Sequence, residues 1–403
     1  MQKFQRGEIP GPPSARFACC LAAAALAALA AGCQTTSRFP TATRAIWVTR
    51  GDYKTPDDVL RIMQDCQSAG FSTVMFQVRG NGTAFYRSRL EPWADELGGK
   101  YPGFDPLRIA CDEAHTRGMQ LHAWVNVMPA WRGTTPPANP DQLYNKHPEW
   151  FWYDQHGERQ ALSSFYVSLN PCLPEVREYL VRVFREVVAG YKVDGLHLDY
   201  IRFPNEPPAT PKDSGLDYPR DARTLELYRR ETGKSPDDNI DDWKRWRAAQ
   251  VTRLVRSIHD MVQRTRPRAL LTAAVGSKPE GPLEAHYRDS DTWVRQRLVD
   301  AVFPMNYTDK VELFAERAKA WTEPQYGVPV VTGIMLDNRE PSLIDEQIGI
   351  AIEHSPHLCL FAYAALFDRG ENQPETQPSD SRIRRAERRA RVIEALQQPR
   401  RSE

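Results

Sequence analysis

Short apolar runs alternate with longer amphipathic stretches from residue 44 onward. Runs rich in β-branched and aromatic residues predict strands, and stretches with a 3.6-residue apolar period predict helices. The predicted strands cover residues 44–50, 72–79, 120–126, 195–203, 270–277, 300–307, 328–335 and 358–366. The predicted helices cover residues 55–69, 105–117, 173–190, 241–267, 288–298, 310–321 and 341–353. Such alternation is typical of an α/β protein with a parallel sheet.

The count and length of these units predict a (β/α)8 TIM barrel. Connections from helix to strand are short, whereas those after the third and fourth strands, residues 127–172 and 204–240, are long and include a short helix at 222–230. Barrel enzymes build their sites from the loops that follow the strands, so a site is expected at that end. The alternative is a doubly wound open sheet. A doubly wound sheet that binds a dinucleotide has a glycine-rich turn after its first strand, whereas here the first strand is followed by Arg50-Gly51-Asp52.

The N-terminal residues 1–33 have the pattern of an export signal. Basic residues precede an apolar stretch over 17–31, which is short for a membrane-spanning helix. It ends in Leu-Ala-Ala-Gly-Cys, which resembles a bacterial lipobox with Cys33 as the lipidated residue; a plain signal peptide is the alternative. Because Gln34 follows, we expect an exported protein that is lipid-anchored at the periplasmic face of the outer membrane.

The remaining chain divides into three predicted parts. Residues 34–43 are a polar tether, residues 44–367 the barrel, and residues 368–403 a linker with a basic amphipathic helix at 381–396. The 53 basic and 52 acidic residues nearly cancel, which gives no electrostatic footprint for nucleic acid. The cysteines beyond the signal show no CxxC or zinc spacing, and a bridge between Cys66 and Cys111 is conceivable. No metal or cofactor is expected.

Polar residues recur at the expected inner face of three strands. Successive residues of a strand point to opposite faces, so Leu196 and Leu198 should meet the helices, while His197 and Asp199 face the barrel axis. The same phase turns further residues inward on the second and third strands: Gln77, Arg79, His122, Trp124 and Asn126. Burying an unpaired polar group costs about 1–3 kcal/mol, which favours an active-site rim over a packed interior. Alternatively, Asp199 and Arg79 pair internally and fill the barrel.

Aromatic residues collect near the end of the third strand. They include Trp124, Trp131 and the run at 150–153. Flat apolar faces beside polar donors suit sugar rings, although many of these residues would also serve as loop core. Trp124 is singled out because its strand phase points inward.

Residues 44–130 and 169–204 resemble the bacterial glycosyl-hydrolase-like family ten. The matching segments include RAIWVT at 44–49, FQVRG at 76–80, AFYRS at 84–88, PGFDPL at 102–107, EAHTRG at 113–118, HAWVN at 122–126, LNP at 169–171 and DGLHLDYIRFP at 194–204. The segment FPMNY at 303–307 matches in style. The likeness covers most of residues 44–366.

This resemblance implies an exported or lipid-anchored TIM-barrel glycosidase, with the glycan strands of the cell wall as substrate. It also implies that Asp199 matches the catalytic carboxylate of related barrels, acting as nucleophile or transition-state stabiliser. Arg79 or Arg202 would lower the pKa of Asp199. The residues expected to bind the sugar all lie on or near the inner face of the strands: Gln77, Arg79, His122, Trp124, Asn126, His197, Arg202, Asn306, Tyr307 and Tyr363.

Glycoside cleavage normally needs two carboxyl groups, and the second is left open by the sequence. The candidates are Asp309, Asp337 and Glu280, in that order. Asp309 has a structural alternative as an N-cap of the helix that follows. Two other classes compete with a glycosidase: a mononuclear metal site built from His122, His197 and Asp199, and a glycan-binding barrel without catalysis.

Overall fold

The computed structural model describes residues 39–203, 215–284, 286–322, 326–368 and 382–397. The signal with Cys33, the first half of the tether and most of the linker lie outside the described residues. The expectations attached to them therefore stay predictions.

Eight parallel strands form a single sheet. They are β1 (Thr43–Val48), β2 (Thr73–Arg79), β3 (Gln120–Asn126), β6 (Gly195–Asp199), β7 (Leu270–Val275), β8 (Ala301–Pro304), β9 (Thr332–Met335) and β10 (His357–Phe361). Their order is β8-β7-β6-β3-β2-β1-β10-β9. Isolated parallel bridges join the edge strands, and the Val331 N–H donates to the Val302 carbonyl oxygen at 2.8 Å. The sheet thus closes into a barrel, which confirms the prediction of a TIM barrel and excludes the doubly wound open sheet.

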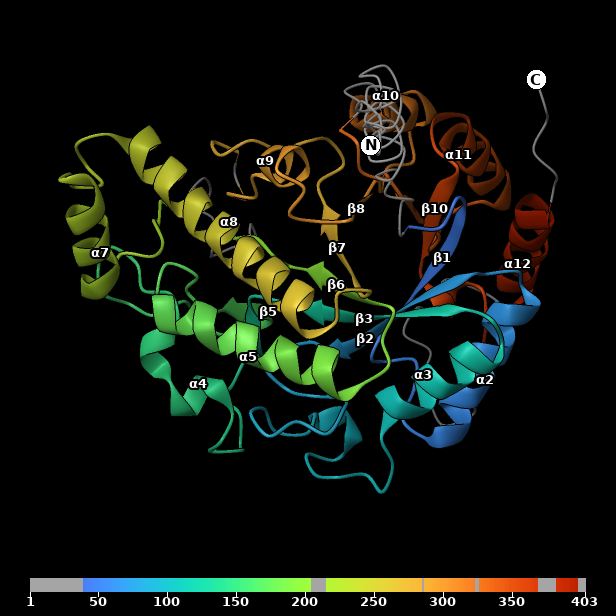
Figure 1. Ribbon diagram of the computed structural model, residues 1–403, viewed down its shortest axis with the longest axis horizontal. Coiled ribbons are helices and arrows are strands. Elements are labelled where there is room, and N and C mark those ends of the chain that lie inside the picture. Colours follow the sequence, from blue (N-terminus) through green and yellow to red (C-terminus); the bar gives the residue numbers. More distant parts are fainter. Residues whose placement is uncertain (1–38, 204–214, 285, 323–325, 369–381, 398–403) are drawn as a thin grey trace, which may run out of the picture. The chain divides into compact units, whose positions relative to one another are not determined.

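Helices follow the strands as predicted (Figure 1). They are α2 (Pro56–Ser68), α3 (Pro106–Thr116), α5 (Pro174–Gly190), α7 (Ala222–Thr232), α8 (Ile240–Thr265), α9 (Ser290–Arg295), α10 (Val311–Thr322), α11 (Pro341–His354) and α12 (Arg382–Gln397). Local sequence explains several starts. Thr55 and Asp58 form a capping box at α2, and the Asp105 carboxylate accepts the Arg108 N–H at α3. Helices α5 and α8 lie side by side (Figure 1).

The long loop after β3 has structure that the sequence did not predict. Strands β4 (Pro129–Gly133) and β5 (Ser163–Ser168) pair antiparallel, with Arg132 opposite Tyr166. The short helix α4 (Leu143–Lys146) and the 3₁₀ turn η2 (Pro148–Trp150) lie between them. Further 3₁₀ turns are η1 (Asp95–Leu97) after β2 and η3 (Tyr363–Ala365) after β10.

The two faces of β6 follow the predicted alternation. Leu196 and Leu198 are wholly buried in the main hydrophobic cluster. His197 lies inside the barrel, where its ring centroid is 6.0 Å from that of Trp47 on β1. Gly195 permits close packing here, because a Cβ atom at this position would lie 2.3 Å from Nδ1 of His122. The interior below the strand ends is thus filled by side chains.

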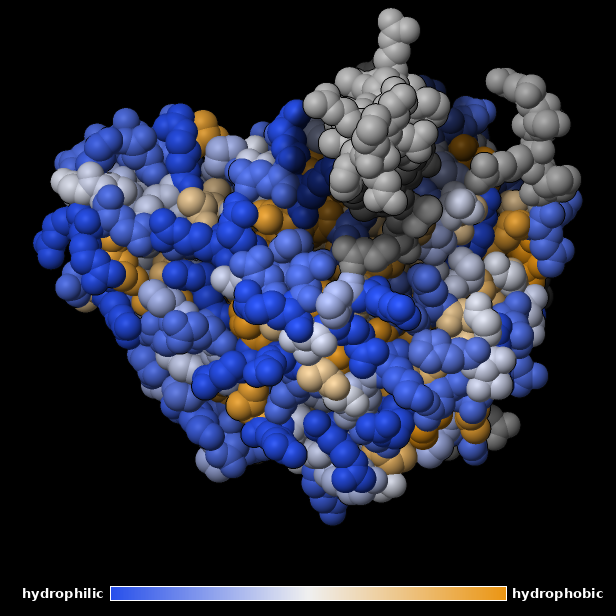
Figure 2. Space-filling view, viewed as in Figure 1, coloured by the Kyte–Doolittle hydropathy of each residue, from blue (hydrophilic) through white to orange (hydrophobic). Residues whose placement is uncertain are grey.

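The surface shows no extended apolar area on the face drawn in Figure 2, outside the grey residues. The large exposed hydrophobic residues are scattered: Leu60, Leu90, Tyr101, Ile240 and Leu283. Among the described helices none has the length and apolarity to cross a membrane. Cys66, Cys111, Cys172 and Cys359 are buried and free, so the conceivable bridge between the first two is not formed.

Candidate active site

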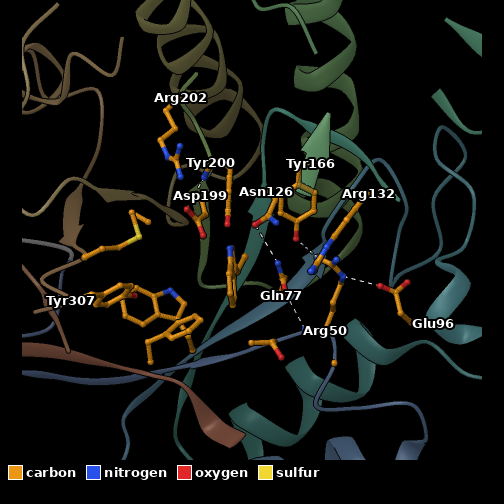
Figure 3. Close-up of a pocket in the computed structure, with 17 residues that line it drawn as sticks. Arg50, Gln77, Glu96, Asn126, Arg132, Tyr166, Asp199, Tyr200, Arg202 and Tyr307 are labelled. Carbon is orange, nitrogen blue, oxygen red and sulfur yellow. Dashed lines mark hydrogen bonds and ion pairs between the residues drawn. The ribbon is translucent and has the colours of Figure 1, made fainter. Parts of the chain in front are cut away.

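A cavity of about 470 Å³ opens at the C-terminal ends of the strands (Figure 3). This volume falls in the range of small-molecule sites, and the position is where TIM-barrel enzymes place their chemistry. Its lining comes from several strand ends and loops: Trp47, Thr49, Arg50, Gly51, Gln77, Glu96, Trp124, Asn126, Arg132, Tyr166, Asp199, Tyr200, Arg202, Ala274, Met305, Tyr307 and Phe361.

One wall of the cavity is aromatic. The Phe361 ring centroid lies 6.0 Å from that of Trp47, 6.4 Å from that of Trp124 and 5.7 Å from that of Tyr307. These residues come from β1, β3, β10 and the loop after β8, so only the closed barrel assembles them. Burial and then the charge of Asp199 raise the pKa of Tyr307, which keeps its hydroxyl protonated. The wall offers flat apolar faces with a hydrogen-bond donor at one edge.

A chain of hydrogen bonds fixes the polar wall. The Arg50 backbone N–H donates to Oε1 of Gln77 at 3.0 Å, and Nε2 of Gln77 donates to Oδ1 of Asn126 at 3.2 Å. Nδ2 of Asn126 then donates to the Gly80 carbonyl oxygen at 3.1 Å. Both amides are thereby held in one orientation beside the cavity.

Asp199 ends β6 and is only 7% exposed. Its Oδ1 accepts the Tyr200 N–H at 2.6 Å, and Tyr200 has a positive φ of 48°, which non-glycine residues seldom adopt. Burial raises the pKa of Asp199, against the opposing effects of the Tyr200 N–H and of the charges on Arg202 and Arg288. Arg202 lowers this pKa as expected, but desolvation outweighs the nearby charges, so the net shift is upward rather than downward. Arg79 pairs with Glu91 instead.

Trp124 also acts on this carboxyl group. Its indole N–H favours the ionised form of Asp199, although it forms no hydrogen bond of ordinary geometry within the described part of the chain. The charge of Arg202 also favours the ionised form of Asp199, and its guanidinium carbon lies 5.0 Å from the Tyr200 ring centroid. Burial and the neighbouring charge of Arg288 lower the pKa of Arg202. Asp199 is thus buried, and nearby donor groups stabilise its ionised form.

Five of the ten expected sugar-binding residues line the cavity: Gln77, Trp124, Asn126, Arg202 and Tyr307. Arg79 does not. A β-bulge between Gln77 and Arg79 reverses the strand phase, because Gln77 pairs with Trp124 and Arg79 with Val125. The Arg79 side chain is wholly buried and pairs with Glu91 at 2.7 Å. Its expected inward orientation is wrong.

His122 and His197 face the interior but lie below the cavity. The Trp47 indole donates to Nε2 of His197 at 3.1 Å, so that nitrogen carries no proton, and Nδ1 is 2.9 Å from Oγ1 of Thr272. Burial lowers the pKa of His122 to about 4 and also lowers the pKa of His197. Both rings are neutral packing groups.

The alternative of a mononuclear metal site at His122, His197 and Asp199 is excluded by these contacts, because both ring nitrogens of His197 already have hydrogen-bond partners. In the part of the chain that the structure describes, no three His, Cys, Asp or Glu side chains are grouped as metal ligands.

Two other expected sugar-binding residues serve the barrel framework. Nδ2 of Asn306 donates to the Phe314 carbonyl oxygen at 2.9 Å, which ties the loop after β8 to α10. The Tyr363 hydroxyl donates to Oδ2 of Asp65 on α2 at 2.6 Å. Neither residue lines the cavity, so neither placement supports sugar binding.

The candidates for a second carboxyl group also lie off the cavity. Asp309 is 66% exposed at its side chain and lies 3.6 Å from Arg339. Glu280 is paired with Arg288 at 2.5 Å. Asp337 does not contribute to the lining, although its charge raises the pKa of Tyr307. The lining acids are Asp199 and Glu96.

Sequence reasoning missed several lining residues, among them Arg50, Glu96, Arg132, Tyr166 and Tyr200. Arg50 lies two residues beyond β1 and Tyr200 directly follows β6, so the general rule for barrels could have found them. Glu96 lies in η1, and Arg132 and Tyr166 in the β4–β5 pair, where no local pattern points to the cavity.

The fold and the site define a glycoside hydrolase-like TIM barrel, since aromatic faces and a buried carboxyl group meet at the C-terminal ends of its strands. The chain belongs to the glycosyl hydrolase-like 10 family, whose model matches residues 42–342.

Curated relatives agree with this family. The glycosyl hydrolase YngK of Bacillus subtilis is 27% identical over 270 residues, covering 62% of this chain and 48% of that protein. The glycosyl hydrolase DigH of Escherichia coli K12 is 30% identical over 269 residues, covering 60% of this chain and 55% of that protein. The chain thus spans about half the length of these relatives.

Solved structures share the fold. The PgaB (BpsB) glycoside hydrolase domain of Bordetella bronchiseptica has a TM-score of 0.61 at 13% identity, covering 79% of this chain and 94% of that domain. The catalytic domain of a β-amylase from Paenibacillus polymyxa has a TM-score of 0.59 at 11% identity, covering 89% of this chain and 99% of that domain.

Proposed function

We propose that this protein hydrolyses a bacterial polysaccharide, with the glycan strands of the cell wall as its substrate. The observation that carries the proposal is Asp199, a buried carboxyl group with a raised pKa that lines an aromatic-walled cavity. Glycosidases need a carboxylic acid that keeps its proton until the leaving oxygen takes it. Names of relatives such as YngK and DigH support the reaction class.

In this proposal Asp199 is the proton donor, a change from the nucleophile role that the sequence favoured. Its Oδ1 accepts the Tyr200 N–H, which leaves Oδ2 to give a proton to the glycosidic oxygen as the bond from that oxygen to the anomeric carbon breaks. A water molecule adds to the anomeric carbon, and the proton that it releases restores the acid form of Asp199. Once the proton has left, Arg202 and the Trp124 indole favour the carboxylate. The aromatic wall stacks on the sugar ring, and the oriented amides of Gln77 and Asn126 bind hydroxyl groups.

Glu96, the other acidic residue of the cavity lining, is assigned a positioning role. Its carboxylate holds the Arg50 guanidinium, with Oε1 and Nε 2.9 Å apart. In Figure 3 it lies at the far end of the labelled group from Asp199, beyond Gln77 and Arg50. We therefore propose that Glu96 positions Arg50 rather than transferring a proton to the bond that breaks.

The proposal is tested by digesting intact and peptide-stripped cell-wall glycans and analysing the products by mass. We expect soluble fragments, with a kcat/KM that falls as pH rises because the protonated form of Asp199 is consumed. Since burial raises the pKa of this residue, the fall should lie above the ordinary range of an aspartic acid. Binding of glycan without any product would instead identify a glycan-binding barrel.

We further propose that the protein is exported and anchored by lipid at Cys33, on the basis of the lipobox-like segment. Metabolic labelling with a fatty-acid probe should mark the wild-type chain and leave Cys33→Ala unmarked. Labelling that persists in the variant would rule out this attachment site.

A further inference from the structure

The charges around the cavity are unequal. Arg50, Arg132 and Arg202 line it, against the two carboxyl groups of Asp199 and Glu96. Even with both carboxyl groups ionised, the three guanidinium groups outnumber them. Guanidinium groups remain charged at any physiological pH. The cavity is therefore cationic when empty.

Arg50 has a partner within the protein. Its Nε pairs with Glu96, and its Nη1 donates to the Tyr166 hydroxyl at 3.2 Å. The pKa of Arg50 is raised, since the contributions of Tyr166 and Glu96 outweigh the effect of burial. Arg50 is a fixed part of the wall.

Arg132 is held differently. Its Nε donates to the Ser164 carbonyl oxygen at 2.8 Å, which ties the base of the guanidinium to β5. Its guanidinium carbon is 5.7 Å from the Tyr166 ring centroid, while that of Arg50 is 5.9 Å from the same ring. Within the described residues, no carboxylate pairs with Arg132, and the residue is exposed at the cavity. Its terminal nitrogens thus face the cavity with a positive charge that the described protein does not neutralise.

We infer that Arg132 is a specificity-determining residue that binds a carboxylate on the sugar chain. This inference rests on the proposed function, and it adds the chemical class of the substrate. The planar guanidinium matches a carboxylate with two parallel hydrogen bonds. Anchoring by Ser164 and the Tyr166 ring restricts its rotamers, which reduces the entropy lost on binding. The β4–β5 pair therefore forms an acidic-sugar subsite beside the aromatic wall.

The test measures binding, so that it does not depend on turnover. The probes are an oligosaccharide from peptide-stripped cell-wall glycan, which carries free carboxylates, and the same oligosaccharide after its carboxylates have been reduced to alcohols. Calorimetry is carried out in an Asp199→Asn background, so that neither probe is consumed. We expect the acidic form to bind about 10- to 100-fold more tightly, the range for a hydrogen bond to a charged group.

Arg132→Gln should remove this preference and leave the affinity for the reduced form unchanged. Arg132→Lys should keep part of it, because the charge remains while the planar fork is lost. Arg182→Gln, an exposed position on α5 away from the cavity, is the matched control and should change neither affinity.

Equal affinities for the two probes, no binding of either, or a preference that survives in Arg132→Gln would overturn the subsite. A preference that depends on Arg132 in a protein without hydrolytic activity would uphold the subsite and refute the proposed hydrolase. Hydrolysis of wall glycan without such a preference would uphold the hydrolase and refute the subsite, so the two failures are distinguishable.

Discussion

Replacing Asp199 by Asn should lower the release of soluble fragments from cell-wall glycan by about 10²- to 10⁴-fold, the usual contribution of a positioned general acid. The amide has nearly the same shape and can still accept the Tyr200 N–H, so the fold should persist. It has no acidic proton for the leaving oxygen. Product release measured by mass analysis, with circular dichroism to verify folding, gives the result.

Asp309→Asn is the control for this experiment. That side chain is 66% exposed and pairs with Arg339 outside the cavity, so its loss should leave turnover near that of the wild type. The pH profile adds a second readout, because the fall in kcat/KM at high pH should disappear with the carboxyl group of Asp199. Full turnover by Asp199→Asn, or a collapse of turnover in Asp309→Asn, would contradict the assignment.

Replacing Glu91 by Gln should lower the free energy of unfolding by about 3–5 kcal/mol, because it leaves the buried charge of Arg79 uncompensated. Both side chains are 0% exposed, and Nε and Nη2 of Arg79 each donate to the carboxylate, at 2.7–3.0 Å. Nη1 donates to main-chain oxygens of the loop after β3, among them those of Val127 and Pro129 at 3.2 Å. The pair thus joins two loops at the cavity end of the barrel.

Urea unfolding followed by circular dichroism measures this loss. Glu316→Gln is the control, since Glu316 pairs with Lys278 at 2.6 Å on the surface and both side chains are about half exposed. Solvent screens such a pair, so its loss should leave the midpoint nearly unchanged. Equal midpoints for Glu91→Gln and the wild type would show that the buried pair adds nothing to stability.

The framework of the barrel was predictable because its signals are local. Period-two alternation on β6 places Leu196 outward and His197 and Asp199 inward, whatever lies around the strand. Capping residues such as Thr55 and Asp105 mark helix starts within a few residues of the sequence. The family resemblance rested on the same segments and is confirmed by the match over residues 42–342.

The residues that line the cavity were predicted only in part. Gln77, Trp124 and Asn126 lie on regular strands, and alternation assigned their side correctly. Arg79 lies one residue beyond a bulge, which the alternation rule does not foresee, and its phase was therefore reversed. His122 faces inward as expected but lies too deep, because Gly195 lets its ring pack across the barrel.

By itself the sequence determined the order of strands and helices, the inner face of each regular strand and the family. The tertiary structure decided which inward groups reach the cavity, that burial raises the pKa of Asp199 against its cationic neighbours, and that Arg132 and Tyr166 stand beside it. The physical reason is the distance along the chain over which each effect acts. Propensity and alternation act between neighbours in sequence, whereas desolvation and charge balance depend on every segment that folds around a group.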